Sequence, residues 1–364
     1  MEEEKMKASK IIILICVLAL CLGAFYGCGR SKSADVHVFY YTYSDTYIST
    51  VRASLDKQLG DAGISYQDHD GNNNQTTQTE QVQTAITKGA KLIVVNIVTT
   101  GSDDAANGIV SLARDAGIPV IFFNREVSDG VVKSYDKCIF IGTDAAEAGY
   151  LQGDMIGDYV VKNYNAIDLN DDGKISYVMF MGEKGNNEAI YRTQYSVENA
   201  NKKLEEAGKP ALEFYDKANN DKYLLDRDGK WSAQAANEYM TTILASYNTQ
   251  NKNMVELVIC NNDGMAEGAI SALSGAGFNT GAANATSIPV FGVDATSAAV
   301  SLIGAGKMAG TIKQDADGMA TAIMKSVSNS LDGKALLSGM SDYQIDDDVN
   351  KVRIHYSVYL GENK

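Results

Sequence analysis

The chain has 364 residues, of which 45% are hydrophobic, three are proline and five are cysteine. This composition is typical of one large or two ordinary globular domains, and it excludes a disordered chain, a collagen-like repeat and a small disulfide scaffold. The formal net charge of −14 disfavours nucleic acid as a partner, because an acidic protein repels a phosphate backbone, and it favours a small ligand.

The N-terminus predicts an export signal. Residues 11–25 form a continuous apolar run that is shorter than the ~20 residues of a membrane-spanning helix. The run follows three basic residues, Lys5, Lys7 and Lys10. A basic flank before a short apolar core is typical of a secretory signal.

A cysteine stands just after this run. Gly27-Cys28 resembles the end of a bacterial lipobox, in which the cysteine becomes the acylated first residue of the mature protein. We therefore predict a signal peptide over residues 1–27 and a lipid-anchored tether over residues 28–34. The protein would be an extracytoplasmic lipoprotein of the cell membrane, at the cell surface or in the periplasm. A plain signal peptide and an uncleaved anchor are the alternatives.

From residue 35 onward, short apolar runs alternate with amphipathic segments. The predicted strands are 36–41, 64–67, 92–95, 120–123, 139–141, 175–181, 212–215, 257–260, 290–293 and 310–312. The predicted helices are 48–59, 78–87, 145–161, 196–207, 234–244, 265–273 and 319–331. This alternation predicts right-handed βαβ crossovers and parallel sheets covered on both faces. So many strands exceed one ordinary sheet, so we expect an α/β protein with two doubly wound domains.

Two cysteines lie beyond the signal, Cys138 and Cys260, each in an apolar strand-like run. A disulfide is one interpretation for an exported protein. Buried free thiols that act as small hydrophobic side chains are the interpretation that we favour.

Polar side chains follow six of the predicted strands. The segments are 42–47, 124–126, 182–188, 261–263, residue 294 and 313–315. Ligands of open parallel sheets bind outside the carboxyl ends of the strands, and planar carboxylate, amide and guanidinium groups suit vicinal hydroxyls. A single Asp or Asn at such a place is usually a turn residue or a helix cap. Six such strand ends together predict a polyol-binding site.

Catalytic motifs are absent from the sequence. It contains no phosphate-binding glycine loop and no G-x-S-x-G elbow, and its histidines (His37, His69 and His355) lack metal-ligand spacing. We therefore predict a binding protein and not an enzyme. Glycoside hydrolysis by a pair of carboxylates is the alternative.

A calcium-loop pattern begins at Asp168. The segment reproduces the start of an EF-hand loop. It has oxygen-bearing side chains at Asp168, Asn170 and Asp172, then a glycine, and then the backbone carbonyl of Lys174. The position of the twelfth ligand is Met179, so a structural calcium ion would need a carboxylate from elsewhere. The alternative is an acidic Asx-turn before a strand.

Together these residues resemble the galactose/glucose-binding proteins, the receptors of bacterial sugar ABC importers with the type I periplasmic-binding fold. The resemblance extends over residues 35–359, and its most specific stretches are 122–126, 134–137, 142–144, 168–170, 258–263 and 287–294. It implies two parallel-sheet lobes joined by a three-segment hinge. By this resemblance, one lobe comprises residues 35–143 and 314–351, and the other comprises 144–313 and 352–364.

The resemblance also implies a site for a monosaccharide, D-galactose or D-glucose. It places aromatic rings at Tyr47 and Trp231 on the two sides of the sugar. The matching polar ligands are Asp45, Asn124, Arg192, Asn262 and Asp294. The chain departs from the family at three further ligand positions, Asn186, Glu188 and Gln314, where the family has histidine, aspartate and asparagine. Another monosaccharide, such as a pentose, is therefore the alternative.

For the cation, the resemblance supplies the missing carboxylate as Glu256. Ser176 stands where the family has a glutamine ligand. The implied calcium ligands are Asp168, Asn170, Asp172, Lys174, Ser176 and Glu256.

The implied cycle is closure of the lobes around one sugar, followed by docking of this monomer on an ABC permease. The membrane would be contacted only through the lipid anchor. A receptor that presents sugar to a chemoreceptor or a sensor kinase is the alternative. A sugar-responsive repressor would need a DNA-binding motif where this chain has its export signal.

Overall fold

The computed structural model describes residues 34–361. The predicted signal and Cys28 lie outside these residues, so both stay predictions. Within the described range, no helix is both long enough and apolar enough to cross a membrane. Residues from Asp35 onward form one compact unit, which contains two sheets.

The first sheet has seven strands in the spatial order β12-β13-β5-β4-β3-β1-β2. They are β1 (Val36–Tyr40), β2 (Tyr66–Asp70), β3 (Leu92–Val95), β4 (Val120–Phe123), β5 (Cys138–Gly142), β12 (Gln344–Ile345) and β13 (Lys351–Arg353). All neighbours pair in parallel except β12, which is antiparallel to β13 at one edge. Parallel pairing places the carboxyl ends of β1, β3, β4 and β5 on the same side.

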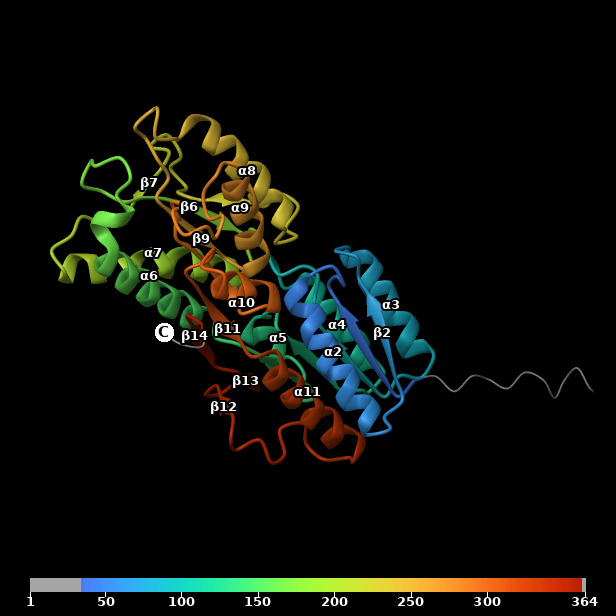
Figure 1. The fold of residues 1–364 in the computed structure, drawn as a ribbon. Helices are drawn as coiled ribbons and strands as arrows, with labels where there is room; N and C mark the ends of the chain where they lie inside the picture. Colours follow the sequence, from blue (N-terminus) through green and yellow to red (C-terminus); the bar gives the residue numbers. More distant parts are fainter. Residues whose placement is uncertain (1–33, 362–364) are drawn as a thin grey trace, which may run out of the picture. The chain divides into compact units, whose positions relative to one another are not determined.

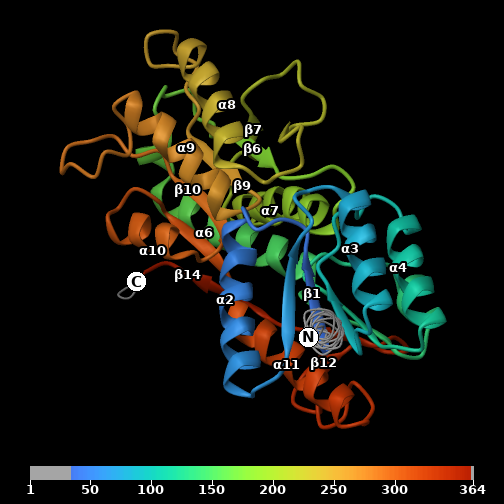
Figure 2. The ribbon, with the colours of Figure 1, turned by 90° about the vertical axis from the view of Figure 1, so that its right-hand side faces the viewer.

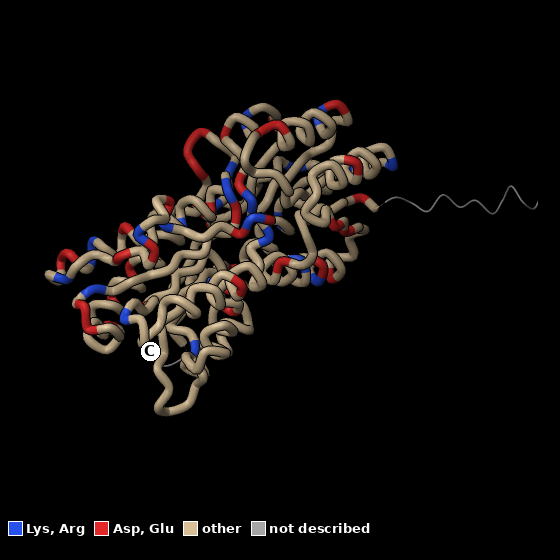
Figure 3. Tube along the Cα trace, turned by 90° about the horizontal axis from the view of Figure 1, so that it is seen from above, with Lys and Arg blue, Asp and Glu red and all other residues tan. Residues whose placement is uncertain are grey.

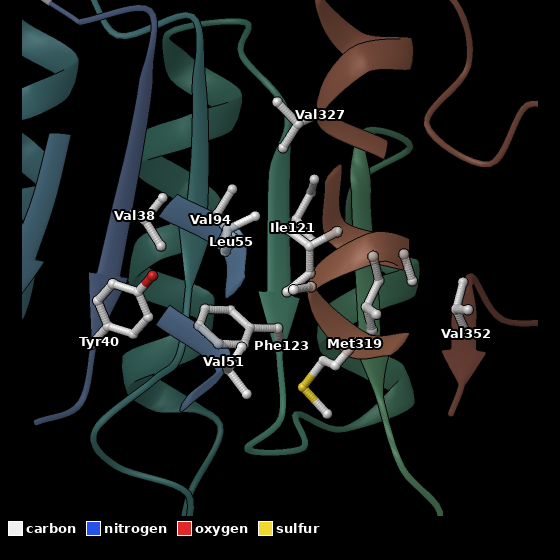
Figure 4. Packing of buried hydrophobic residues seen from close by; sticks show 14 of the residues in the cluster. Val38, Tyr40, Val51, Leu55, Val94, Ile121, Phe123, Met319, Val327 and Val352 are labelled. Carbon is white, nitrogen blue, oxygen red and sulfur yellow. The ribbon is translucent and has the colours of Figure 1, made fainter. Parts of the chain in front are cut away.

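Helices cover both faces of the first sheet (Figures 1 and 2). Val38 and Tyr40 pack with α2 (Thr46–Asp61) and α11 (Ala316–Leu331), as Figure 4 shows. Phe39, which points to the opposite face, packs with the other three helices, α3 (Gln75–Thr87), α4 (Asp104–Asp115) and α5 (Asp129–Lys133). Because side chains alternate along a strand, one apolar run supplies both cores.

The second sheet has the order β14-β11-β10-β9-β6-β7, and β8 also pairs with β6. Its strands are β6 (Ser176–Met181), β7 (Glu213–Phe214), β8 (Leu224–Leu225), β9 (Leu257–Cys260), β10 (Val290–Asp294), β11 (Gly310–Gln314) and β14 (Tyr356–Tyr359). Only β14 is antiparallel to its neighbour. On one face lie α6 (Ala145–Ile167) and α7 (Asn187–Glu206); on the other lie α8 (Ala233–Ser246), α9 (Asp263–Gly275) and α10 (Ser297–Gly304).

The predicted fold class is thus confirmed: two doubly wound parallel-sheet lobes. We call the first sheet with α2, α3, α4, α5 and α11 the first lobe, and the second sheet with its helices the second lobe. Cys138 and Cys260 are buried free thiols, one in each sheet, as we favoured. Burial raises the pKa of the Cys138 thiol to about 12.

The chain crosses between the lobes at three places. The first crossing, at Thr143 and Asp144, lies between β5 and α6 as the resemblance implies. The other two differ from the implied boundaries. Gln314 still pairs with Tyr356 in the second sheet, and Val352 pairs with Ile141 in the first. These ladder hydrogen bonds keep residues 314 and 352–353 in their sheets, so the chain crosses only after Gln314 and after Arg353.

Acidic and basic residues are interspersed along the described chain (Figure 3). Most of the ion pairs are exposed, for example Lys57–Asp61 and Lys334–Asp332, and solvent-exposed ion pairs add little to the stability of a fold. The excess acidity is therefore mainly surface charge, apart from the buried carboxylates described below.

Candidate functional site

The carboxyl ends of strands from both lobes meet at one cavity with about 360 Å³ of empty space. All ten side chains predicted to contact the sugar line this cavity. Three further residues line it that the sequence did not single out as ligands, Tyr41, Ile48 and Arg125. The structure therefore brings together residues that are as much as 269 positions apart in the sequence, from Asp45 to Gln314.

The first lobe contributes Asp45 and Asn124. Asp45 is the N-cap of α2: its Oδ1 accepts a hydrogen bond from the Ile48 amide at 2.7 Å, and its Oδ2 accepts one from the Tyr41 hydroxyl at 2.6 Å. Asn124 follows β4 and is held by Asn96, whose Nδ2 donates to Asn124 Oδ1 at 3.1 Å. Both polar groups are thus fixed in orientation before any ligand arrives.

In the second lobe, α7 directs three of the predicted residues into the cavity. Asn186 is the N-cap of α7, and its side chain accepts a hydrogen bond from the Ala189 amide. Glu188 and Arg192 are four residues apart, so they lie on one face of the helix and are 5% and 3% exposed.

Arg192 connects α7 to the ends of three strands. Its Nη1 donates to the Asn261 carbonyl at 2.9 Å, and its Nη2 donates to the Tyr356 hydroxyl at 2.7 Å and to Gln314 Oε1 at 3.3 Å. The Tyr356 hydroxyl also pairs with Thr143 Oγ1, at the first crossing between the lobes. Arg192 therefore couples the cavity to two of the crossing segments.

Three buried polar atoms of the cavity residues have no hydrogen-bond partner within residues 34–361. They are Glu188 Oε1, Arg192 Nε and Gln314 Nε2. Buried polar atoms in folded proteins are nearly always hydrogen-bonded, and an unpaired one costs about 1–3 kcal/mol. One acceptor and two donors without partners, all in one cavity, are what a hydroxyl-bearing ligand would satisfy.

Two carboxylates of the cavity have raised pKa values. Burial raises the pKa of Glu188 to about 7, although Arg192 opposes the shift. Burial and the neighbouring Asp263 raise the pKa of Asp294 well above its usual range, and Arg192 again opposes it. Arg192 is thus the cation that both carboxylates share.

Three cavity residues have a backbone conformation that favours glycine. The φ angles are +60° at Asn124, +55° at Trp231 and +129° at Asp294. Asparagine tolerates this region, but the tryptophan and the aspartate are strained there by about 1–3 kcal/mol each. Such strain is concentrated at functional sites, because the surrounding fold must hold it.

The ring of Trp231 lies against the backbone of Gly182. A Cβ atom built on Gly182 would come within 2.2 Å of ring atoms of Trp231, so only glycine fits there. The ring Nε1 donates to Glu183 Oε2 at 3.3 Å, and Asn262 Nδ2 donates to the Trp231 carbonyl at 3.2 Å. Hydrogen bonds therefore hold both the ring and the backbone carbonyl of this tryptophan.

Hydrogen bonds join the two lobes beside this ring. Arg125 Nη2 contacts Glu183 Oε2 at 2.6 Å, and the Thr100 hydroxyl donates to Glu183 Oε1 at 3.3 Å. The Arg125 side chain is 5% exposed, so this ion pair is shielded from solvent. We call this contact the Arg125–Glu183 bridge. It brings the lobes together on one side of the cavity.

The predicted calcium loop lies at the start of β6, remote in sequence from Glu256. Its side chains fold the loop: Asp168 and Asn170 accept from the Asp172 amide, and Asp172 accepts from the Lys174 amide at 2.9 Å. Glu256 does reach the loop, where its carboxylate accepts from the amides of Leu169 at 2.7 Å and Ser176 at 2.9 Å.

Oxygen donors of this kind suit calcium, and the Glu256 carboxylate contacts the backbone of the loop. Across residues 34–361, however, no three or more His, Cys, Asp or Glu side chains are grouped closely enough to hold a metal ion. The hydrogen bonds of the loop are also those of an Asx-turn. Calcium therefore stays a prediction.

Two doubly wound lobes around one polar cavity define a hinged ligand-binding protein. The family model described as a periplasmic binding protein domain matches residues 36–335, and the chain belongs to the periplasmic binding protein family. This confirms the predicted family, and with it the expectation of an extracytoplasmic receptor that is not an enzyme.

Two similar proteins support this assignment. The chain is 32% identical over 354 residues to the D-galactose/methyl-galactoside binding periplasmic protein MglB of Haemophilus influenzae. This match covers 96% of each chain. A solved structure from Bacillus halodurans C-125, an ABC transporter solute binding protein with bound myo-inositol, is 26% identical with a TM-score of 0.65. The match covers 91% of this chain and 95% of that one.

A third similarity concerns the fold alone. A solute binding protein from Clostridium phytofermentans with bound β-D-glucose has a TM-score of 0.67 at 22% identity, over 89% of this chain and 93% of that one.

Proposed function

We propose that this receptor binds D-galactose and D-glucose and delivers them to an ABC permease after closure of its lobes. The observation that carries the proposal is the set of unpartnered buried atoms on Glu188, Arg192 and Gln314, in a cavity that is lined by all ten side chains predicted to contact the sugar. The similarity to a galactose-binding protein at 32% identity supports the hexose class.

The three departures from the family keep hydrogen-bonding capacity. Asn186 and Gln314 are amides that both donate and accept, and Glu188 is an acceptor when ionised. Asn186 is already used as the cap of α7, so the unpartnered atoms of Glu188 and Gln314 are the ones free for ligand. The site therefore suits a monosaccharide, and the exact preference depends on these two positions.

Titration calorimetry against a panel of small polyols tests this proposal. We expect glucose or galactose to bind with micromolar affinity, about −8 kcal/mol, and to bind more tightly than xylose, ribose, arabinose or myo-inositol. Tighter binding of a pentose or of inositol would replace the hexose assignment, and no binding of any of these polyols would contradict the function itself.

A sensory role is the second candidate, in which the closed form contacts a chemoreceptor or a sensor kinase. Deletion of the permease distinguishes the two roles. Sugar uptake should fall if the receptor serves transport, and unchanged uptake would favour the sensory role. We also propose that Cys28 carries the lipid anchor, on the strength of the sequence pattern.

We further propose that the loop at Asp168, together with Glu256, holds a structural calcium ion. We expect 1 mM calcium to raise the midpoint of thermal unfolding relative to EDTA, since a ligand at 1,000 times its Kd adds about 4 kcal/mol of stability. Glu256→Gln should lose this increase. Glu213→Gln is the control, because Glu213 is not a proposed calcium ligand. Its solvent-accessible carboxylate pairs with the ammonium group of Lys174, whereas the proposed ligand of that residue is its backbone carbonyl. An equal response to calcium in all three proteins, or none in the wild type, would contradict the site.

A further inference from the structure

A second cavity adjoins the first on the other side of Asp45. It is an open groove with about 640 Å³ of empty space, and Asp45 lines both cavities. One wall of the groove is the segment before α2 and its first turns, and the other is formed by α9 and the start of α10. The groove therefore lies between the lobes, as the sugar cavity does.

The lining of the groove is rich in hydroxyl groups. Ser44, Thr46 and Ser49 come from the first lobe, and Thr296 and Ser297 come from the second. Glu267 adds a half-buried carboxylate, whose Oε1 accepts from Thr296 Oγ1 at 3.3 Å. Hydroxyl groups both donate and accept, so this lining suits a hydroxylated ligand better than an apolar one.

The lobes are not joined across this groove. Within residues 34–361, hydrogen bonds between the lobes run through Glu183, Asn186, Asn187 and Asp228 on the side of the Arg125–Glu183 bridge, and through the crossing segments. None of them comes from the groove residues. A ligand larger than one sugar would therefore extend out of the cavity on the side of Asp45, because the Arg125–Glu183 bridge closes the other side.

Asp45 lies where the two cavities adjoin. Its carboxylate is held by the Tyr41 hydroxyl and by the Ile48 amide, so it is a fixed part of the lining of both cavities.

We propose that the groove is a subsite for a second hydroxylated unit attached to the bound sugar, so that the receptor also takes a disaccharide. This inference rests on the proposed function, since the first unit occupies the sugar cavity. It extends that function by naming a larger class of ligand and the residues that receive the extra unit.

Calorimetry of the full mature protein with lactose, melibiose, maltose and cellobiose tests the subsite, with glucose and galactose measured in parallel. We expect at least one disaccharide to bind. Ser297→Trp, which fills the groove from an exposed position, should weaken binding of that disaccharide by at least about tenfold and leave the affinities for the monosaccharides within about twofold. Ser301→Trp, one turn further along α10 and also exposed, is the matched control and should change neither.

Each outcome decides between the proposals. Binding of monosaccharides without any disaccharide would overturn the subsite and leave the proposed function intact. The same holds if Ser297→Trp weakens both classes of ligand equally or changes neither. Absence of all binding would instead contradict the proposed function on which the subsite rests.

Discussion

Replacement of Arg192 by lysine is expected to weaken sugar binding by at least about 100-fold. Arg192 lines the cavity and has two occupied nitrogens and one buried Nε that has no partner within residues 34–361. Lysine keeps the positive charge but has one compact donor group, so it cannot reproduce the planar fork that contacts Asn261, Gln314 and Tyr356 together. The buried partners would be left unpaired, which also costs about 1–3 kcal/mol of folding stability for each.

The measurement is calorimetry together with urea unfolding of the same variant. Arg227→Lys is the control, because Arg227 is an exposed arginine of the second lobe outside the cavity. Wild-type affinity in Arg192→Lys would show that the charge alone is sufficient and that the fork geometry is not required. A loss of stability without a loss of affinity would assign Arg192 to the fold and not to the site.

Much of this architecture is encoded in the sequence in a form that can be recognised without a structure. Buried parallel strands such as β4 and β9 are short continuous apolar runs, so their positions were predicted correctly. The edge strand β2 has the sequence YQDHD and is only partly buried, so the strand predicted over 64–67 starts two residues early and ends three residues early. The two-residue strands β8 and β12 carry no pattern that is long enough to detect.

The site divides in the same way. Asp45, Asn124, Asn262, Asp294 and Gln314 lie at or just after the carboxyl ends of strands, so the topology predicts that they gather at that edge of their own sheets. Glu188 falls in the polar segment 182–188 after β6, so the strand-end pattern includes it. Arg192 lies within α7 and Trp231 lies in a loop, and only the family resemblance indicates these two residues. Arg125 falls in the predicted polar segment 124–126, but its ion pair with Glu183 is not predicted, because Glu183 lies in the other lobe and 58 residues away in the sequence. Packing between lobes leaves no local signal in the sequence.

Replacement of Gly182 by alanine is expected to weaken sugar binding by about tenfold or more by moving the ring of Trp231. The φ angle of Gly182 is not in the left-handed region, so alanine fits the backbone, but its Cβ would lie 2.2 Å from the ring. The ring must shift, because neither the end of β6 nor its neighbour β9 can move without breaking the ladder between them. Overpacking of this kind costs about 1–3 kcal/mol of stability.

Fluorescence reports this displacement directly, because Trp231 is the only tryptophan of the chain. A shifted ring loses its contacts with Gly182 and Glu183, so its emission should change in the ligand-free variant, and its response to sugar should require higher concentrations. Gly108→Ala is the matched control, since a Cβ there meets no atom within 4 Å on α4, and it should gain about 0.5–1 kcal/mol of stability with unchanged binding. Unaltered emission and affinity in Gly182→Ala would show that the ring can adapt, and that its position against Gly182 does not determine sugar binding.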